Sequence, residues 1–228
     1  MTIQEAMMRC AVLQQAAPAS IAALANSASL RWIKKGKHLF WDKEQSSHLF
    51  FVAEGCFSLY KQNSVGEKKV IFVYGVGEML NEVMLHDVAA SISCEAFSHA
   101  AALCFPMPTF ARVMEEDPLL TNAVMHSMAH KIRRLYRQMK NTIGSIRGDK
   151  RIAAKLWKLS QDHGVPCGSG TRIPLSLSIT YLADMLGAKR ETVSRQMKLL
   201  TDAGLVLPSP EGFIIPNRDK LREYFKAP

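Results

Sequence analysis

Two short amphipathic runs in the C-terminal third of the chain have the spacing of helices. In residues 179–186, apolar side chains recur at helical intervals behind Ser178, whose hydroxyl can accept a backbone N–H of the first turn. Gly187 interrupts this pattern, as a glycine in left-handed conformation does at a helix end. A second run, residues 190–201, separates an apolar side from Lys, Arg and Glu. Two short helices joined by a glycine-containing turn predict a helix-turn-helix, whose second helix enters the DNA major groove.

The chain behind these two helices has the pattern of a β-hairpin. Two apolar runs, 205–207 and 213–215, flank a turn made of Pro, Ser, Glu and Gly. A hairpin behind the second helix makes a winged helix, and Asn217 then caps a short final helix through Phe225. The alternative is an ordinary helical hairpin with a solvated charged face. The wing favours the DNA-binding interpretation.

The N-terminal half changes from helical to strand-like spacing near Leu30. Residues 1–28 have apolar positions at helical intervals and predict two short helices. From Leu30 onward, short β-branched and aromatic runs alternate with glycines. Many short strands with turn glycines predict an antiparallel barrel or jelly roll, which closes with residues 89–105. Residues 63–67 are the expected hairpin tip.

A long helix is predicted to follow the roll. Asp117 suits its N-cap and Pro118 its first helical position. Apolar positions then recur at alternating intervals of four and three residues, which is the repeat of a coiled-coil seam. The predicted dimer interface consists of Met125, Met128, Ile132, Leu135, Met139, Thr142 and Ile146, with Thr121 at its start. A two-fold homodimer suits a helix-turn-helix that reads a palindrome, whereas the alternative is a helix lying along its own roll.

The segment after the long helix completes the expected domain organisation. Gly144 and Gly148 predict a hinge, residues 149–161 a further amphipathic helix, and residues 163–170 a surface loop by composition. The expected fold class is α+β, with an antiparallel β-roll, a long dimerisation helix and a winged helix-turn-helix. The expected domains are an effector-sensing roll with its N-terminal helices (1–116), the dimerisation helix and hinge (117–147), and the DNA-binding domain (148–228).

Charge and cysteine usage narrow the class of protein. The net charge is +9, and residues 147–228 contain 14 Lys and Arg against 8 Asp and Glu. This basic third favours a polyanionic partner. The five cysteines have no C-x-x-C pair, which indicates reduced thiols rather than a disulfide framework. No apolar run approaches the roughly 20 residues of a membrane span, so we expect a cytoplasmic protein that does not associate with membranes.

The motifs of common enzyme classes are absent from the sequence. A cupin-type metal enzyme on a β-roll would need a cluster of His and carboxylate ligands near H-x-H spacing, and no H-x-H occurs. G-x-S-x-G, Walker-type and H-E-x-x-H motifs are also missing. We therefore expect no enzyme activity and no catalytic residues. A roll used only for protein–protein interaction stays open as an alternative, although Arg190, Glu191 and Arg195 together speak against it.

The order of these elements resembles the cyclic-AMP receptor protein / fumarate-and-nitrate-reduction regulator (CRP/FNR) family of bacterial transcription regulators. Residues 46–60 (SSHLFFVAEGCFSLY) look like the roll signature of that family, and residues 75–78 (GVGE) like its glycine turn with an acidic residue. Residues 190–195 (RETVSR) are close to its recognition-helix motif, which is the most specific part of the resemblance. The resemblance implies a dimeric, cytoplasmic regulator whose roll senses a signal and whose DNA binding recruits or blocks RNA polymerase.

The departures from the family pattern concern the signal. Members that bind cyclic nucleotide hold its phosphate with an Arg-Ser pair, and the matching stretch here reads Val88-Ala-Ala-Ser-Ile92. Leu135 and Tyr136 stand where a Thr-Ser pair would contact adenine. These differences argue against cyclic AMP. An iron–sulfur cluster usually needs four thiolates, and only Cys10 lies near the N-terminus, which argues against that cofactor as well.

Other signals stay open at the level of sequence. Haem is possible through the roll cysteines or through His38, His48, His86 and His99, although each is more readily explained as a surface or core residue. His126 and His130 share a helix face, but no third metal ligand accompanies them, so no metal site is predicted. A small organic effector is the remaining option. Its expected pocket consists of Glu78, Ser91, Met128, Ile132, Leu135 and Tyr136, and Met125 could also line it.

The start of the second helix carries the expected DNA contacts. Arginine can donate bidentately to guanine, and glutamate can accept from cytosine. The predicted base contacts are Arg190, Glu191, Ser194 and Arg195, and the predicted phosphate contacts are Ser178, Lys189, Thr192 and Lys198. The resemblance implies half-sites of a TTGA or a TGTGA type. The sequence mixes features of both, so the prediction is double-stranded DNA with inverted half-sites that share a TGA core.

Overall fold

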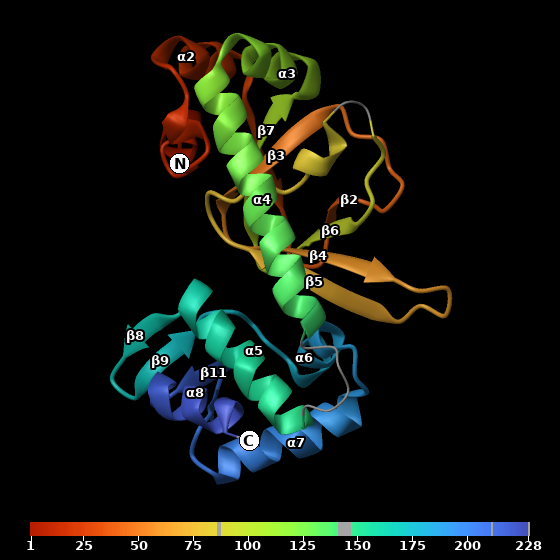
Figure 1. Ribbon diagram of the computed structural model, residues 1–228, viewed down its shortest axis with the longest axis vertical. Helices are drawn as coiled ribbons and strands as arrows, with labels where there is room; N and C mark the ends of the chain where they lie inside the picture. The colour runs from red at the N-terminus through yellow and green to blue at the C-terminus, as the bar shows by residue number, and fades with distance from the viewer. Residues whose placement is uncertain (86–87, 141–146, 211, 228) are drawn as a thin grey trace. The chain divides into compact units, whose positions relative to one another are not determined.

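The computed structural model describes residues 1–85, 88–140, 147–210 and 212–227. The chain divides into two compact units (Figure 1). The first contains Met1–Lys61 and Ile71–Tyr136, and the second contains Gln62–Val70 and Arg137–Pro228. The two units are described separately below.

The chain begins with short helices, as its pattern predicts. They are α1 (Ile3–Met7), a 3₁₀ turn η1 (Leu13–Gln15) and α2 (Pro18–Ser27). Thr2 and Glu5 form a capping box at α1, because each side chain bonds to the other residue's backbone N–H. Leu13 and Leu24 are fully buried, so these helices pack on the roll rather than extending from it.

The roll consists of two antiparallel sheets. One has the strand order β1-β7-β3 and the other β2-β6-β4-β5. The strands are β1 (Ser29–Ile33), β2 (His38–Phe40), β3 (His48–Glu54), β4 (Phe57–Gln62), β5 (Lys68–Tyr74), β6 (Ser93–Ala96) and β7 (Ala100–Pro106). A single 3₁₀ turn, η2 (Glu82–Met84), lies in the described part of the loop between β5 and β6. This arrangement confirms the predicted roll, with residues 63–67 joining β4 to β5.

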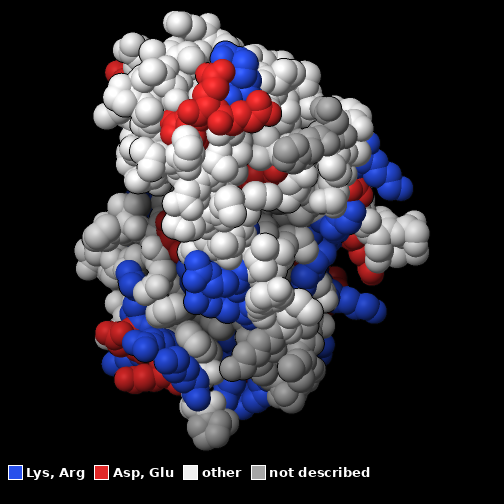
Figure 2. Space-filling model, turned by 45° about the horizontal axis from the view of Figure 1, so that its top comes forward, with Lys and Arg blue, Asp and Glu red and all other residues white. Residues whose placement is uncertain are grey.

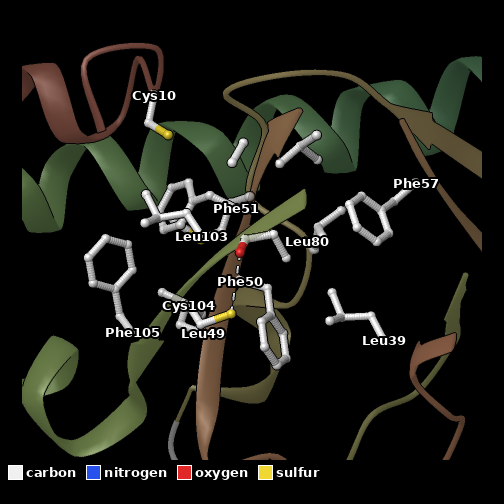
Figure 3. Close-up of a cluster of buried hydrophobic side chains, with 14 of the residues drawn as sticks. Cys10, Leu39, Leu49, Phe50, Phe51, Phe57, Leu80, Leu103, Cys104 and Phe105 are labelled. Carbon is white, nitrogen blue, oxygen red and sulfur yellow. Dashed lines mark hydrogen bonds between the residues drawn. The ribbon is translucent and has the colours of Figure 1, made fainter. Parts of the chain in front are cut away.

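The core of the roll is aromatic and aliphatic (Figure 3). The ring of Phe51 on β3 meets that of Phe105 on β7 edge to face, with centroids 5.7 Å apart. Phe110 closes this group from the helix that follows β7, 6.0 Å from Phe51. All three side chains are fully buried. Such aromatic groups remove much apolar area from water, and this burial is the main force holding the strands together.

Two glycines of the roll, Gly36 and Gly77, differ in the space around them, and this difference predicts how much each alanine substitution destabilises the fold. Gly77 has φ +88°, and a Cβ there would lie 2.3 Å from the backbone oxygen of Arg9. Gly36 has a similar φ of +76° with no atom within 4 Å of the added carbon. Gly36→Ala should therefore cost about 1–2 kcal/mol for the left-handed backbone alone. Gly77→Ala should cost clearly more, since a backbone carbonyl must also move. Urea unfolding of both variants measures this difference, and equal losses would contradict it.

A pair of helices follows the roll. No element was predicted for residues 106–116, but they form α3 (Met107–Glu116), whose Phe110 and Val113 face the core. Next comes α4 (Pro118–Lys140), the predicted long helix. Asp117 caps it as expected, because its carboxylate accepts the N–H groups of Leu119 and Leu120 at 3.0 and 3.1 Å. Residues 141–146, which include the predicted hinge glycine Gly144, lie outside the described residues.

The second unit is a winged helix with a larger sheet than predicted. Its helices are α5 (Gly148–His163), α6 (Ile179–Leu186), α7 (Arg190–Asp202) and α8 (Arg218–Lys226). Its strands are β8 (Val165–Cys167), β9 (Gly170–Ile173), β10 (Leu207–Ser209) and β11 (Gly212–Ile215), in the order β10-β11-β9-β8. Asn217 caps α8 as predicted, accepting from Asp219 and Lys220.

One prediction for this unit was wrong. Residues 163–170 are not a plain surface loop, because 165–167 pair with 170–172 as the β8–β9 hairpin. The segment is rich in Gly, Pro, Cys and Ser, which are more typical of loops, so its composition does not indicate the two strands. The pairing partner that stabilises the hairpin is β11, more than 40 residues away in sequence, which bonds to β9 from Phe213 to Ile215.

Candidate DNA-binding surface and effector site

The turn between α6 and α7 has the geometry that its sequence predicts. Ser178 accepts the N–H of Tyr181 at 3.0 Å and so caps α6. Gly187 ends α6 in left-handed conformation, with φ 61° and ψ 48°. Lys189 is extended and α7 begins at Arg190. The two helices are held together by buried apolar side chains, namely Leu182, Ala183, Met185, Leu186, Val193, Met197 and Leu200.

The first turns of α7 present polar side chains to solvent. The predicted base contacts, Arg190, Glu191, Ser194 and Arg195, are all exposed on this helix. Ser178, Lys189 and Lys198 of the predicted phosphate contacts are exposed too, whereas Thr192 is half-buried. Ser178 caps α6, and Lys198 lies farther along α7. The other six residues lie at or near the N-terminus of α7. That end of a helix also carries the positive pole of its dipole, which favours phosphate nearby.

Helix α5 supports this surface from behind. Arg151 donates to the backbone oxygen of Leu186 at 2.7 Å and so satisfies a carbonyl at the end of α6. Gly148, a predicted hinge residue, is the first residue of α5, and a Cβ there would lie 2.0 Å from the side chain of Gln196 on α7. Gly148 is thus closely packed against the recognition helix, and Gly148→Ala would disturb that contact as well as the backbone.

A buried carboxylate joins the beginning and the end of the second unit. Asp149 accepts from Arg147 at 2.9 Å and from the Tyr224 hydroxyl on α8 at 2.5 Å. Burial opposes its ionisation, but these hydrogen bonds outweigh burial and the pKa of Asp149 is lowered. Helix α5 is further fixed to α8 by the ring contact of Trp157 with Phe225.

Basic side chains are prominent on the face of the molecule drawn in Figure 2, where Lys and Arg atoms form several exposed groups in the lower half of the view. By sequence, residues 147–228 have an excess of Lys and Arg over Asp and Glu. Such an excess attracts a polyanion without choosing a sequence.

The residues predicted to line an effector pocket do not converge. Glu78 belongs to the roll and pairs with Arg134 of α4, and Met128 of α4 packs against the core of the roll. Ser91 is exposed on the described part of the loop before β6. Ile132, Leu135 and Tyr136 are 47%, 39% and 67% exposed on α4. Ile132 and Tyr136 lie on the side of α4 away from Lys131 and Arg134, whereas Leu135 borders the side that carries these two cations.

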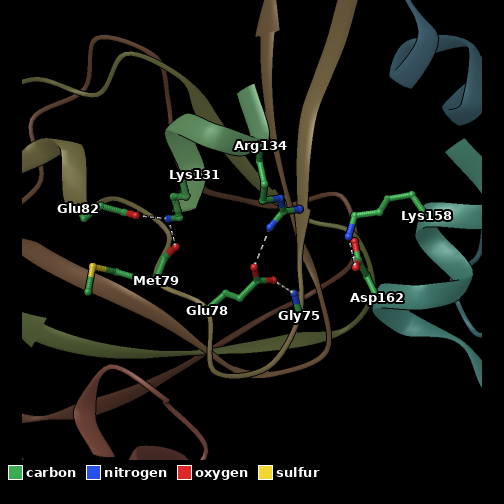
Figure 4. A network of polar contacts seen from close by, with 8 residues as sticks. All are labelled: Gly75, Glu78, Met79, Glu82, Lys131, Arg134, Lys158 and Asp162. Carbon is green, nitrogen blue, oxygen red and sulfur yellow. Dashed lines mark hydrogen bonds and ion pairs between the residues drawn. The ribbon is translucent and has the colours of Figure 1, made fainter. Parts of the chain in front are cut away.

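The structure instead brings two cations of α4 against two acids of the roll (Figure 4). Lys131 pairs with Glu82 and donates to the backbone oxygen of Met79 at 2.5 Å. Arg134 pairs with Glu78 at 3.0 Å, and the other oxygen of Glu78 accepts the N–H of Gly75 at 2.9 Å. The side chains of Lys131 and Glu82 are only 15% and 2% exposed. Pairing is what makes such burial of charge tolerable.

Aromatic rings surround these ion pairs. The Lys131 ammonium lies 4.5 Å from the ring centre of Tyr74, and the Arg134 guanidinium lies 5.0 Å from that of Phe72. Burial lowers the pKa of Lys131, against the influence of Glu82. Burial likewise raises the pKa of Glu78, and Arg134 acts in the opposite direction. The hydroxyl of Tyr74 is buried without a hydrogen-bond partner among the described residues.

Three of the histidines considered as haem ligands contact other side chains of the roll. His38 bonds to the Tyr60 hydroxyl at 2.6 Å, His48 bonds to Ser47, and His99 packs beside Trp32. His86 lies outside the described residues. Burial raises the pKa of Cys56 and of Cys104 to about 11 and that of Cys94 well above its usual value, which disfavours their thiolates. Within the described residues, no three His, Cys, Asp or Glu side chains are placed to hold a metal ion.

The outward side of α4 is apolar. Met125, Ile132, Leu135 and Met139 of the predicted dimer interface are exposed, and Tyr136 joins them. Met128 differs because it packs on the roll. Thr142 and Ile146 lie outside the described residues. No helix in the described part of the chain is long and apolar enough to span a membrane.

Known proteins share both parts of this architecture. Residues 30–117 match the model of the cyclic nucleotide-binding domain, and residues 150–224 match that of the Crp-like helix-turn-helix domain. A probable transcriptional regulator of Lacticaseibacillus casei is 26% identical over 93% of both chains. A CRP-like cAMP-activated global transcriptional regulator of Mycobacterium tuberculosis is 20% identical, covering 96% of this chain and 98% of the relative.

A solved structure shows the same fold. The c-di-GMP responsive global regulator of Xanthomonas campestris superposes with a TM-score of 0.76 at 17% identity, over 88% of this chain and 100% of that one. The two matched domains, the whole-length relatives and the winged helix with its exposed recognition helix lead to one assignment. The chain belongs to the CRP/FNR family of transcription regulators.

Proposed function

We propose that the protein is a cytoplasmic homodimer that binds duplex DNA at inverted half-sites and acts on RNA polymerase at promoters. The observation that carries this proposal is the exposed group Arg190, Glu191 and Arg195 at the start of α7. These side chains stand on a helix whose apolar side is anchored by Val193, Met197 and Leu200. A rigid helix with exposed bidentate donors and an acceptor is suited to reading base edges in the major groove.

The roles of the exposed residues follow from their chemistry. Glu191 and Arg195, four residues apart, project from nearly one line of the helix, with Arg190 and Ser194 beside them. Glu191 accepts from a cytosine N4, and Arg195 and Arg190 donate to guanines, within a half-site that has a TGA core. Lys189, Lys198, Ser178 and Thr192 contact phosphates, which adds affinity but no sequence information.

The dimer forms through the outward side of α4. Met125, Ala129, Ile132, Tyr136 and Met139 alternate at intervals of four and three residues and are all exposed. This is the repeat of a two-stranded coiled coil. This seam is shifted by one position from the predicted seam through Met128, whose side chain packs in part against the core of the roll. A two-fold dimer has two copies of α7, one for each of the two inverted half-sites.

The effector of this dimer is not cyclic AMP. The apolar Ala90 stands where the arginine of the phosphate-binding pair is expected, next to Ser91. Lys131 and Arg134 are already paired with Glu82 and Glu78 of the roll. An isothermal titration with cyclic AMP should therefore show no binding tighter than about 1 mM. A micromolar site would contradict this view of the loop between β5 and β6.

Two other functions are less well supported. A metal-dependent β-roll enzyme would need a cluster of metal ligands, and no three His, Cys, Asp or Glu side chains of the described residues are placed to hold a metal ion. A protein with an inactive winged helix would have no need of exposed Arg190 and Arg195. We propose that the protein is not an enzyme.

Fluorescence anisotropy tests the proposed function. The full-length protein should bind a duplex with inverted TGA half-sites at least roughly a thousandfold more tightly than a scrambled duplex, as specific regulators do. The affinity should fall steeply as salt increases, because counterions are released. Equal affinity for both duplexes, or no binding to either, would contradict it.

A further inference from the structure

Neither the DNA-binding surface nor the outward side of α4 uses the charged cluster at the roll. Lys131 and Arg134 lie three residues apart on α4, and both reach toward the loop that follows β5 (Figure 4). Each cation has its own acid, Glu82 for Lys131 and Glu78 for Arg134. The cluster therefore links one turn of the helix to the roll at two points.

The acidic loop is itself fixed to the roll. Asn81, between the two acids, is almost fully buried. Its side-chain oxygen accepts the N–H of Phe50 at 2.8 Å, and its amide donates to the backbone oxygen of His48 at 2.9 Å. Phe50 and His48 belong to β3. The acids are thus presented from an anchored loop, and α4 has a defined place to dock.

We propose that these two ion pairs are an internal clasp that sets the rotation of α4 about its axis without a bound effector. Residues three apart share a helix side, so when Lys131 and Arg134 face the roll, Ile132 and Met125 face outward. The clasp thereby presents the apolar seam to a second copy. This inference rests on the proposed dimer through α4.

The clasp has a consequence for regulation. A ligand that enters between this loop and α4 must displace Glu78 or Glu82 from its cation. Such a ligand shifts the equilibrium only by its preference for the opened form. In the unliganded protein, therefore, α4 is fixed and its apolar seam faces the second copy. An effector that bound at this place would loosen α4.

Substitution of each cation tests the clasp in the full-length protein without added ligand. Lys131→Met and Arg134→Met should each speed hydrogen exchange of the α4 amides near residues 128–136 at least tenfold, and should weaken the dimer at least tenfold by sedimentation. Arg133→Met is the matched control, because Arg133 is an exposed cation of the same turn. It should leave both quantities unchanged.

A double substitution separates pairing from mere packing. Lys131→Met leaves the Glu82 carboxylate buried and unpaired, so adding Glu82→Met should restore much of the lost protection. If Lys131→Met does not fold, Arg134→Met with Glu78→Met gives the same cycle at the more accessible pair. Strictly additive effects, or cation variants that behave like Arg133→Met, would overturn the clasp. Ile132→Asp tests the seam independently, so failure of the dimer proposal is distinguishable from failure of the clasp.

Discussion

Ile132→Asp should convert the proposed dimer into a folded monomer. Ile132 is 47% exposed in the single chain, so the aspartate costs little there. In a two-fold seam the two new carboxylates lie opposite each other and are buried without partners, at about 3 kcal/mol or more. This corresponds to more than roughly a hundredfold increase in the dimer dissociation constant. Sedimentation velocity gives the mass, and circular dichroism checks that the monomer is folded.

Arg133→Asp is the control for this prediction. It introduces the same residue one position along α4, outside the proposed seam, and should leave the mass unchanged. The monomeric Ile132→Asp variant should also lose most of its DNA affinity, because one winged helix contacts only one half-site. A dimer mass for Ile132→Asp would place the interface on another surface.

Arg195→Ala should relax the base preference of the protein at a single position. A bidentate arginine–guanine contact contributes about 1–3 kcal/mol to discrimination. Binding to the preferred duplex should weaken by that amount, while binding to a duplex altered at this guanine should change little. Competition anisotropy with duplexes altered one base pair at a time measures the loss.

Lys198→Ala provides the contrast on the same helix. Lys198 is exposed on α7 and is proposed to contact phosphate. Its removal should weaken all duplexes alike and lower the salt slope by about one. If Arg195→Ala also weakened all duplexes alike, Arg195 would be a phosphate contact and not a base reader.

Local signals explain why much of the fold could be predicted from the sequence. Asp117, Ser178 and Asn217 each cap a helix through hydrogen bonds within three residues of themselves. Gly187 adopts the left-handed conformation that ends α6, which glycine takes readily because it has no Cβ. Such features depend on neighbours in sequence, so reading the sequence can find them.

Elements that depend on distant partners were harder to predict. The β8–β9 hairpin is stabilised by β11, whose residue Phe213 pairs with Ile173. Helix α3 is held by burial of Phe110 and Val113 in the roll. The composition of the β8–β9 segment is not typical of strands, and there tertiary pairing outweighs local preference. Helix α3 does contain helix-forming residues with a proline in its first turn, which were overlooked as signals in the sequence.

The two candidate sites differ for the same reason. The proposed base contacts lie near one helix N-terminus, so a short motif brings Arg190, Glu191 and Arg195 together. The roll cluster joins Glu78 to Arg134, which are 56 residues apart. Ile132 and Leu135 were predicted to lie on the side of α4 that faces the roll, so Lys131 and Arg134 were not identified as the residues that pair with the roll. Their spacing of three residues was the available signal, together with the acids at 78 and 82.

Selection from a pool of random duplexes tests the central claim most directly. The unmodified protein is incubated with the pool at physiological salt, and the bound duplexes are sequenced after several rounds. The account predicts enriched sites with two inverted TGA half-sites, centred about 10–10.5 base pairs apart. Enriched sites without an inverted TGA, or no enrichment at all, would contradict the assignment of Glu191 and Arg195 as the residues that read the bases.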